Sequence, residues 1–481
     1  MTALRAQRCD VLVLGAGPAG MAAATQAAQG GLSVTLLDEQ AAAGGQVYRA
    51  PPAEFGPAPA PASPDAKSGT VLRLALAASG ARHLPQRRVW FVEPGFRLHV
   101  VGVEGPELHE APQLILATGA YERLVPAPGW TLPGVVGLAA ATVMLKAEGV
   151  LPGHRTVVAG VGPLLAAVAV GILKAGGKVA AVIDLARPND WLRRLPALAA
   201  RPELLARGVG WRARLAVARV PVLHGYTVVA LHGEGELDTV EVAPVDAVSW
   251  RPLDGPRRRI EADACALGHG LVPDTSITRL LQLRHVFRPE QGGWVAETDA
   301  DLRTSLPGLY VAGDGAGIGG AAAAAERGRI AALAAMRDAG RLDIAGHAAQ
   351  AAAPRAARQR AERFGAGIAT LMQARPGPYA AIPPETVVCR CEDVTRAKIE
   401  TALDAGARDV NQAKAWTRCG MGPCQGRLCG ETLAELVALR LGDRAAAGQF
   451  TGRAPLRPVP YDMLVGDFDY DALDLPAPAP S

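Results

Sequence analysis

Five cysteines that lie close together are the residues of this chain most clearly suited to chemistry. The chain has seven cysteines, and five of them crowd into one stretch near its C-terminal end: Cys389, Cys391, Cys419, Cys424 and Cys429. Thiolates bind iron–sulfur clusters and zinc. In a cytosolic chain, such crowding indicates a metal site rather than disulfide bonds.

Two short helices are predicted between the first of these cysteines and the last. A C-x-C pair opens the stretch, Thr395 can cap a helix that Gly406 ends, and Asp409 with Gln412 forms a capping box for a second helix. These helices would bring the opening pair near the later cysteines. Three later cysteines then compete for the two remaining positions of a four-thiolate site.

A second set of residues suited to chemistry is a glycine-rich turn near the N-terminus. Gly15, Gly17 and Gly20 follow an apolar run in G-x-G-x-x-G spacing, a small-residue helix comes next, and a β-rich run ends on Asp38. The first glycine makes the tight turn, the second lets the backbone approach a pyrophosphate, and the third lets the helix pack on the strand. Asp38 lies where a carboxylate accepts both ribose hydroxyls.

Three later motifs accompany this turn in the same order as in a known superfamily. They are GGQ at 44–46, a buried strand ending in Ala-Thr-Gly at 117–119, and LYVAGDGAGIGG at 309–320. Together the motifs resemble the pyridine nucleotide-disulfide oxidoreductase superfamily, whose members bind FAD. In that superfamily the late Gly-Asp pair, here Gly313 and Asp314, places its carboxylate on the flavin ribitol. The helix from about Gly319 to Met336 would point its positive N-terminal end at the flavin.

The resemblance implies a set of FAD contacts drawn from all four motifs and one neighbouring strand. The candidate residues are Gly15, Ala16, Gly17, Pro18, Ala19, Gly20, Asp38, Glu39, Gly44, Gly45, Gln46, Val89, Ala117, Thr118, Gly119, Gly313, Asp314 and Gly320.

A second strand–helix–strand pattern between 155 and 184 carries an incomplete glycine motif. Gly160 and Gly162 hold the first two glycine positions, but Leu165 stands at the third, and Asp184 ends the second strand. A leucine there changes how closely helix and strand approach. NAD(H), another adenine nucleotide and an empty scaffold all remain open for this domain.

The superfamily name implies a redox disulfide, which this sequence lacks. No cysteine follows the first nucleotide motif in GGQVYR, and Cys265 stands alone. Cys9 and Cys265 lie beside apolar runs and are predicted to be small core residues. His269 lies in a Gly-flanked turn, where a packed or solvated histidine is favoured over one that faces substrate.

The cysteine stretch resembles the bacterioferritin-associated-ferredoxin-like [2Fe-2S] domain. That resemblance implies Cys389, Cys391, Cys424 and Cys429 as ligands, with Cys419 as the substitute. Zinc bound by four thiolates is the competing hypothesis. Nearby basic side chains would compensate the negative cluster, and the candidates are Arg390, Lys398, Lys414, Arg418 and Arg427.

Composition and charge narrow the class of protein. The chain of 481 residues is 49% apolar and has a net charge of +4 from 50 basic and 46 acidic residues. No basic stripe is interleaved with aromatics, so nucleic acid is not expected as a partner. The apolar run 157–173 contains glycine and proline and is too short to span a membrane. No signal peptide is recognised, which favours a cytoplasmic location.

The sequence therefore predicts an α/β fold with two Rossmann-like nucleotide-binding domains and a small helical C-terminal [2Fe-2S] domain. The predicted parts are an FAD-binding domain at 1–120 and 285–343, a second NAD-like domain at 121–284, a helical connector and linker at 344–384, the [2Fe-2S] module at 385–445, and an extended tail at 446–481. Residues 50–68, rich in proline and alanine, are predicted as a surface loop.

The whole combination resembles the alpha (A) subunits of heteromeric flavin dehydrogenases, such as opine oxidase, D-hydroxyproline dehydrogenase, proline dehydrogenase complexes and hydrogen cyanide synthase. The resemblance implies an electron-transferring FAD and [2Fe-2S] subunit, a beta subunit with its own FAD that oxidises an amino acid, imino acid or opine, and a downstream electron acceptor. It also allows a location at a membrane through a partner. An NAD(P)H-dependent flavin oxidoreductase and a redox-sensing interaction protein are the alternatives.

Overall fold

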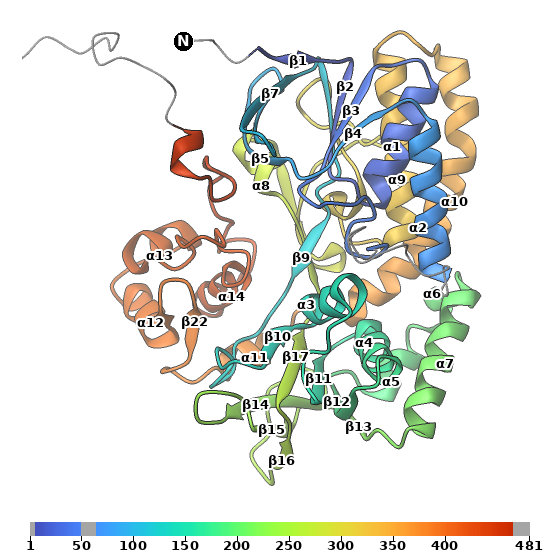
Figure 1. Cartoon of the computed structure of the whole chain (residues 1–481). Coiled ribbons are helices and arrows are strands. Elements are labelled where there is room, and N and C mark those ends of the chain that lie inside the picture. The colour runs from blue at the N-terminus through green and yellow to red at the C-terminus, as the bar shows by residue number, and fades with distance from the viewer. Residues whose placement is uncertain (1–4, 50–63, 465–481) are drawn as a thin grey trace, which may run out of the picture.

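The computed structural model describes residues 5–49 and 64–464 (Figure 1). Two parallel five-stranded sheets with helices packed on them form most of the molecule, and a smaller helical module follows. The α/β architecture with two Rossmann-like units confirms the predicted fold class. The domain boundaries remain predictions.

The first parallel sheet has the strand order β21-β8-β2-β3-β4. Its strands are β2 (Val11–Leu14), β3 (Val34–Leu37), β4 (Arg82–Leu84), β8 (Gln113–Leu116) and β21 (Leu309–Val311). Val11 pairs with both Val34 and Gln113, and every strand pair in this sheet is parallel. The chain therefore leaves this sheet after β8 and returns to it for β21, as expected for a domain split around a second one.

Helices α1 (Pro18–Gln29), α2 (Pro64–Ala78) and α9 (Ala321–Asp338) accompany the first sheet. Small residues let α1 and α9 approach closely, because a Cβ on Gly328 would lie 2.0 Å from the carbonyl oxygen of Ala19. The main core lies between these helices and the sheet. Since α2 begins at Pro64, the loop predicted at 50–68 is wrong over its last residues, and its earlier part lies outside the described residues.

A smaller mixed sheet covers the other side of the first parallel sheet. Its order is β1-β7-β6-β5, made of β1 (Gln7–Arg8), β5 (Arg88–Glu93), β6 (Arg97–Val101) and β7 (Pro106–Glu110). A second core, which includes Leu12, Leu98 and Leu114, lies between the two sheets.

The second parallel sheet has the order β10-β17-β11-β12-β13. Its strands are β10 (Val135–Gly137), β11 (Arg155–Gly160), β12 (Lys178–Asp184), β13 (Val222–His224) and β17 (Ala264–Gly268). The helices of this unit are α3 (Leu138–Val143), η2 (Met144–Glu148), α4 (Pro163–Lys174), α5 (Pro188–Leu192), α6 (Leu195–Leu198) and α7 (Pro202–Val217). An antiparallel sheet is added by β14 (Tyr226–His232), β15 (Thr239–Pro244) and β16 (Arg258–Glu261).

Two antiparallel strands carry the chain between the two units. β9 (Ala120–Glu122) leads out of the first sheet, and β18 (Leu271–Pro273) pairs with it on the way back. The return continues through α8 (Ser276–Leu280), β19 (His285–Arg288), η3 (Pro289–Gln291), β20 (Gly293–Ala296) and, after β21, η4 (Gly313–Ala316).

A long helix, α10 (Ile344–Leu371), runs from the first unit towards the second (Figure 1). Its Asp343 N-cap accepts a hydrogen bond from the Gly346 N–H at 2.7 Å. Gly365 of α10 packs against Gly319, and Gly367 packs against Ala197 of α6. The helix predicted to begin at Ile344 therefore forms and spans both units.

The cysteine module follows α11 (Pro376–Ala380) and contains β22 (Val387–Cys389), β23 (Val394–Thr395), α12 (Arg396–Asp404), α13 (Val410–Thr417) and α14 (Gly430–Leu441). Thr395 caps α12, as predicted. Asp409 caps α13 by accepting from the Asn411 and Gln412 N–H groups. Gln412 accepts from the Arg408 N–H at 2.7 Å, one residue before the position that the capping box predicts.

The segment after the module lies on the first unit. Leu456 is 6% exposed, and its N–H donates to the Trp90 carbonyl at 2.7 Å. The part of the predicted tail around Leu456 therefore packs on the first unit, and η5 (Tyr461–Met463) follows. Its acidic end, residues 465–481, lies outside the described residues.

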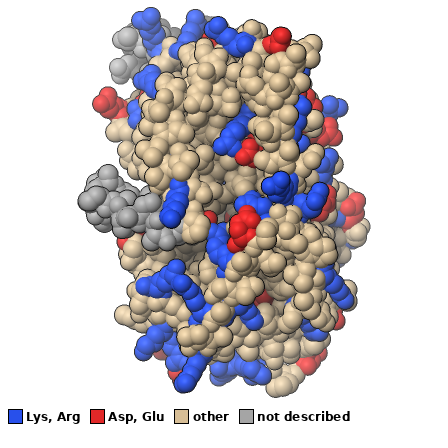
Figure 2. Space-filling view, turned by 90° about the vertical axis from the view of Figure 1, so that its right-hand side faces the viewer, with Lys and Arg blue, Asp and Glu red and all other residues tan. Residues whose placement is uncertain are grey.

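Among the described helices, none has the length and apolarity needed to cross a membrane. On the face of the molecule that carries α10, basic side chains are scattered over both the upper and the lower half of the view, with acidic side chains among them (Figure 2).

Candidate functional site

The first glycine turn is open at one of its three glycines. A Cβ on Gly15, whose φ is +101°, would lie 2.4 Å from the Ala117 carbonyl oxygen, and one on Gly20 would lie 1.7 Å from that of Gly15. By contrast, the nearest atom to a Cβ on Gly17 is the Cα of Gly45, at 3.9 Å. Gly15 and Gly20 are thus required by contacts within the chain, whereas Gly17 borders free space at the N-terminus of α1.

Asp38 closes this turn from the end of β3. Its carboxylate accepts hydrogen bonds from the Ala16 N–H and, at 2.7 Å, from the Gln40 N–H. The side chain is buried, and this burial raises the pKa of the carboxyl. Glu39 is exposed and forms an ion pair with Arg457 at 3.5 Å.

The GGQ motif lies against the same turn. The Gly44 N–H donates to the Ala16 carbonyl at 2.8 Å, and Gly45 packs on Gly17, whereas Gln46 is exposed. Val89 lies apart from these residues, because its side chain is buried in the core between the two sheets of the first unit.

The late Gly-Asp pair lies at the start of α9. Asp314 accepts hydrogen bonds from the N–H groups of Gly319 and Gly320 at 2.9 and 3.1 Å. A Cβ on Gly313 would lie 3.0 Å from the Cβ of Ala19 in α1. The structure therefore brings the first and last motifs of the predicted FAD site together.

Arg327 of α9 fixes the Gly313 turn, and its role was not predicted. Its guanidinium donates to the carbonyl of Gly313 at 2.8 Å and to that of Gly317, and it pairs with Glu362 of α10 at 2.8 Å. Little in the sequence signalled this role, because Glu326 and Arg329 lie beside Arg327 in the same alanine-rich helix.

The Ala-Thr-Gly strand end joins this site to the returning link. The Gly119 carbonyl accepts from the Asp274 N–H at 3.0 Å, and the Thr118 hydroxyl donates to the Asp274 carbonyl at 3.4 Å. Gly119 and Gly320 have positive φ angles and face open space. The open glycines beside a helix N-terminus fit a bound dinucleotide such as FAD.

The second glycine turn is filled by the chain itself. A Cβ on Gly160 would lie 1.7 Å from the Gly268 carbonyl oxygen, and one on Gly162 would lie 2.5 Å from the sulfur of Met372. Leu165, at the third position, is a buried core residue of α4. Met372 follows α10, and no local sequence pattern links it to Gly162.

The carboxylate at this turn is also covered by a side chain. Asp184 accepts hydrogen bonds from the Ala186 N–H at 3.0 Å and from the Trp191 indole N–H at 3.3 Å. Trp191 and Met372 pack in one apolar cluster over the turn. Met372 and Trp191 thus occupy the space beside Gly162 and Asp184 in this structure.

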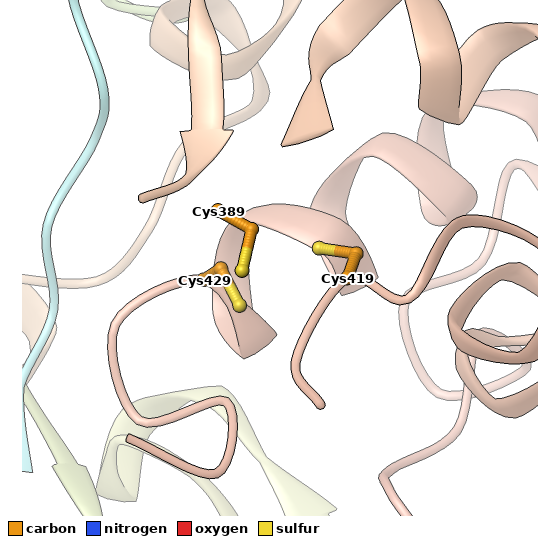
Figure 3. Close-up of side chains that lie close together, drawn as sticks. All are labelled: Cys389, Cys419 and Cys429. Atoms are coloured by element: carbon orange, nitrogen blue, oxygen red, sulfur yellow. The ribbon is translucent and has the colours of Figure 1, made fainter. Parts of the chain in front are cut away.

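Three cysteines of the module bring their sulfur atoms together. The Sγ atoms of Cys389, Cys419 and Cys429 all lie within 4.8 Å of one another, and all three residues are buried. Figure 3 shows their side chains converging from β22, from the loop after α13 and from the start of α14. Cys419, predicted only as a substitute ligand, therefore lies inside the thiol cluster.

The other two cysteines form a neighbouring, more exposed pair. Cys391 interacts with the backbone and side chain of Cys424, and both are partly exposed. A Cβ on Gly422 would lie 2.3 Å from the Cβ of Cys391, so the loop after Cys419 packs directly on Cys391. The module thus gathers all five thiols, a donor set that fits an iron–sulfur cluster.

Hydrogen bonds among these thiols shift their pKa values in opposite directions. Cys419 and Cys429 donate to Cys389, which lowers the pKa of Cys389 and raises the pKa values of the two donors. Burial raises the pKa of Cys391.

Phe450 packs on the cysteine loop, and sequence reasoning missed it. A Cβ on Gly420 or Gly426 would lie 2.7 or 2.4 Å from its ring. The Lys414 ammonium lies 4.8 Å from the ring centroid, and Arg418 pairs with Glu392 at 2.7 Å. These glycines are needed because the aromatic ring occupies the space of their side chains.

The module is hydrogen-bonded to the second unit. The Trp130 indole N–H donates to the Val387 carbonyl at 2.6 Å, close to Cys389 along the chain. Thr432 of α14 is fully buried and donates to the Leu124 carbonyl at 3.2 Å. These bonds hold both ends of the cysteine stretch.

The remaining predicted side chains are packed. Cys265 is buried in β17 and Cys9 packs against the second core, and neither lies beside another cysteine in the described part of the chain. The His269 ring accepts from the Val125 N–H at 3.3 Å, and burial lowers its pKa to about 4. His269 is therefore a neutral, structurally engaged side chain.

Comparisons with known proteins cover nearly the whole chain. Residues 9–338 match the family described as pyridine nucleotide-disulphide oxidoreductase, and residues 384–467 match the sarcosine oxidase A3 domain. The A subunit of opine oxidase from Agrobacterium tumefaciens is 36% identical over 466 residues, which cover 94% of this chain and 90% of the relative. The HcnB subunit of hydrogen cyanide synthase from Pseudomonas aeruginosa is also 36% identical over 466 residues, covering 94% and 97%.

A solved structure has the same fold over most of the chain. The L-proline dehydrogenase from P. horikoshii superposes with a TM-score of 0.70 at 19% identity, covering 97% of this chain and 81% of that one.

Proposed function

We propose a function from one premise: the chain belongs to the pyridine nucleotide-disulphide oxidoreductase family, among the A subunits of opine oxidase and the HcnB subunits of hydrogen cyanide synthase. It is an oxidoreductase and a subunit of a heteromeric flavin dehydrogenase. Its proposed task is to carry electrons between an FAD and a [2Fe-2S] cluster, while a partner subunit oxidises an amino acid, imino acid or opine.

The observation that carries this proposal is the gathering of five thiols in a module that is hydrogen-bonded to the second unit and to the link that returns to the first unit. Three of the sulfur atoms lie within 4.8 Å of one another, and Cys391 adjoins Cys424. A [2Fe-2S] cluster takes four thiolates and supplies one-electron chemistry. We propose Cys389, Cys391, Cys424 and Cys429 as its ligands, with Cys419 as the alternative.

The FAD would lie across the first unit. Gly17, on which Gly45 packs, leaves space for its pyrophosphate at the N-terminus of α1, with Asp38 and Glu39 beside the adenosine end. Asp314 and the N-terminus of α9 lie at the flavin end. A bound flavin supplies two-electron chemistry on the substrate side and one-electron chemistry towards a cluster.

The filled second glycine turn supports electron entry from a partner rather than from NAD(P)H. The names of the relatives as subunits imply further chains, and we propose an FAD-containing beta subunit that holds the substrate, together with a downstream electron acceptor. We place the complex in the cytoplasm, or at a membrane through a partner.

The decisive experiment identifies the copurifying partner chain and its substrate. The complex is purified and assayed with proline, hydroxyproline, sarcosine, glycine and opines, with visible spectra, iron and acid-labile sulfide measured on the same sample. We expect a flavin amine-dehydrogenase partner, flavin absorbance and equal amounts of iron and sulfide. A chain without flavin, or one that holds zinc and no sulfide, would contradict the proposal.

Single cysteine variants assign the cluster ligands. Cys389→Ser is expected to abolish the cluster, because its sulfur adjoins two other thiols. Cys419→Ser and Cys424→Ser form the informative pair. If the proposed ligand set is right, Cys419→Ser keeps its cluster and Cys424→Ser loses it. Cys9→Ser, remote from the module, is the matched control and should retain the full iron content.

A further inference from the structure

Arg427 connects the cysteine loop to the link that returns to the first unit and to the C-terminal segment that lies on that unit. Its guanidinium donates to the Cys424 carbonyl at 3.2 Å, to the Ser276 hydroxyl at 3.3 Å and to the Leu456 carbonyl at 3.2 Å. Leu456 in turn donates its N–H to Trp90 of β5. A planar guanidinium with several fixed donors is suited to holding three acceptors at once.

The contact continues from Ser276 to the strand end at the proposed flavin site. The carboxylate of Asp274 accepts from the Ser276 hydroxyl and, at 2.9 Å, from the Ser276 N–H. The backbone of Asp274 is bonded to Thr118 and Gly119. One run of hydrogen bonds therefore joins Gly119, at the flavin end, to Cys424, at the thiol cluster.

Side-chain packing is incomplete at this junction. A cavity separates the two parts, with Tyr121 and Arg279 on one side and Gln425 and Arg427 on the other. Arg279 donates to the Phe450 carbonyl at 2.6 Å, so this bond reaches the cysteine loop only through the packing of the Phe450 ring, whereas Arg427 belongs to the loop itself. Arg427 thus makes the direct hydrogen bonds between the loop and the link that leads to the strand end. Its Nε–H is buried and has no partner within the described structure, so it could bond to a water or a cofactor atom.

We propose that Arg427 is a positioning residue that holds the cysteine loop at a fixed distance from the flavin-binding strand end, with Ser276 and Asp274 completing the bridge. The inference rests on the proposed function and adds to it the residues that set the relation between its two redox sites. In each transfer one electron leaves the reduced group, which is oxidised, and enters the other, which is reduced, so the rate depends on a distance that this bridge sets.

The test compares Arg427→Met, Arg427→Lys and Ser276→Ala in the complete purified chain. Arg440→Met is the matched control, because Arg440 of α14 pairs with Asp404 inside the module, at 2.6 Å, and not across the junction. Amide hydrogen exchange is followed in peptides covering 271–278 and 419–429. Relaxation of electrons between flavin and cluster after a reducing flash is measured on the same preparations, with iron, sulfide and flavin content as loading checks.

Exchange in both peptides is expected to rise about tenfold in Arg427→Met, the size that loss of charge-assisted hydrogen bonds would produce. The relaxation should slow in parallel, with Arg427→Lys and Ser276→Ala intermediate and the Arg440→Met control unchanged. Unchanged exchange and relaxation in Arg427→Met with full cofactor content would overturn the proposal. If Arg427→Met loses its cluster, Ser276→Ala decides alone, since it lies outside the cysteine loop. A wild-type chain without flavin or cluster would refute the proposed function instead, and the exchange measurement would still test the bridge.

Discussion

The two glycine turns of this chain have similar sequences and opposite surroundings. At the first turn, the nearest atom to a Cβ on Gly17 lies 3.9 Å away, whereas at the second a Cβ on Gly162 would lie 2.5 Å from the sulfur of Met372. Both turns precede a helix N-terminus, so both offer the same backbone donors. The comparison shows that access to such a turn can be decided by a side chain from a distant helix.

The third motif position also differs between the two turns: the first turn has no room for a side chain there, and the second requires one. At Gly20 no side chain fits, because its Cβ would lie 1.7 Å from the Gly15 carbonyl oxygen. At Leu165 a large side chain is needed, since it fills the core between α4 and the second sheet. The first helix is thus packed tightly on its own turn, whereas the second helix places Leu165 in an apolar core.

The largest expected effects come from substituting the residue at the third motif position of each turn. Leu165→Ala should lower the free energy of unfolding by about 2–5 kcal/mol through a core cavity, yet leave flavin bound. Gly20→Ala should cost about 3 kcal/mol or more through overpacking and should also release the flavin. Denaturant unfolding followed by circular dichroism and by flavin fluorescence separates the two results.

Leu164→Ala is the control for the cavity, because Leu164 precedes Leu165 in α4 but is only partly buried. Leu164→Ala should lower the free energy of unfolding clearly less than Leu165→Ala does. If Gly20→Ala kept both its stability and its flavin, the close approach of α1 to its turn would not be a requirement of the site.

The first turn could be predicted because its contacts repeat a known local pattern. Gly15, Gly20 and Asp38 touch residues of one strand–helix–strand unit and the neighbouring strand end. Met372 could not be predicted, because its contact with Gly162 depends on where α10 ends in space. Spacing along the chain predicts Cys424 ahead of Cys419 as a ligand, but it could not predict that Cys419 lies beside Cys389 and Cys429, because that contact depends on the loop between α13 and α14.

Acid should weaken the second turn through His269. This residue follows Gly268, whose carbonyl packs on Gly160, and its ring accepts a hydrogen bond from the Val125 N–H. Because burial lowers its pKa from 6.5 to about 4, the folded chain holds it neutral while the unfolded chain protonates it. The stabilisation is complete above pH 6.5 and is lost as the pH falls towards 4, with a size of up to about 2 kcal/mol after allowance for partial exposure.

His269→Asn keeps an acceptor for Val125 but does not titrate, so it is the matched variant. Its unfolding free energy should fall less than that of the wild type between pH 6.5 and 4. If the unfolding free energies of the two proteins fell equally with pH, groups other than His269 would cause the loss of stability in acid.

Filling the open space of the first turn should weaken flavin binding without unfolding the protein. In Gly17→Val the side chain enters space that no chain atom uses but that a pyrophosphate needs. The expected overpacking of about 1–3 kcal/mol would weaken FAD binding about 5- to 150-fold. Flavin titration of the FAD-free protein measures this change.

Gly208→Val provides the control, because Gly208 of α7 also faces open space but lies away from both turns. Its FAD affinity should equal that of the wild type. Equal affinity in Gly17→Val as well would mean that the pyrophosphate lies elsewhere, and the first turn would then be as unused as the second.

Removing the Met372 side chain from the second turn has the smallest expected effect, and it tests most directly whether that side chain makes the two turns different. We expect no saturable binding of NADH to the wild-type chain up to about 1 mM, which corresponds to a binding free energy weaker than about −4 kcal/mol. Met372→Ala removes the thioether above Gly162 and should cost only about 1 kcal/mol of stability, because Met372 is partly exposed. Calorimetric titration should then detect weak NADH binding in Met372→Ala but not in Met421→Ala, which removes an exposed methionine of the cysteine module. Equal NADH binding by the wild type and Met372→Ala would show that Met372 leaves the turn in solution. The second turn could then accept a dinucleotide as the first does, and the two turns would differ only in which ligand they hold.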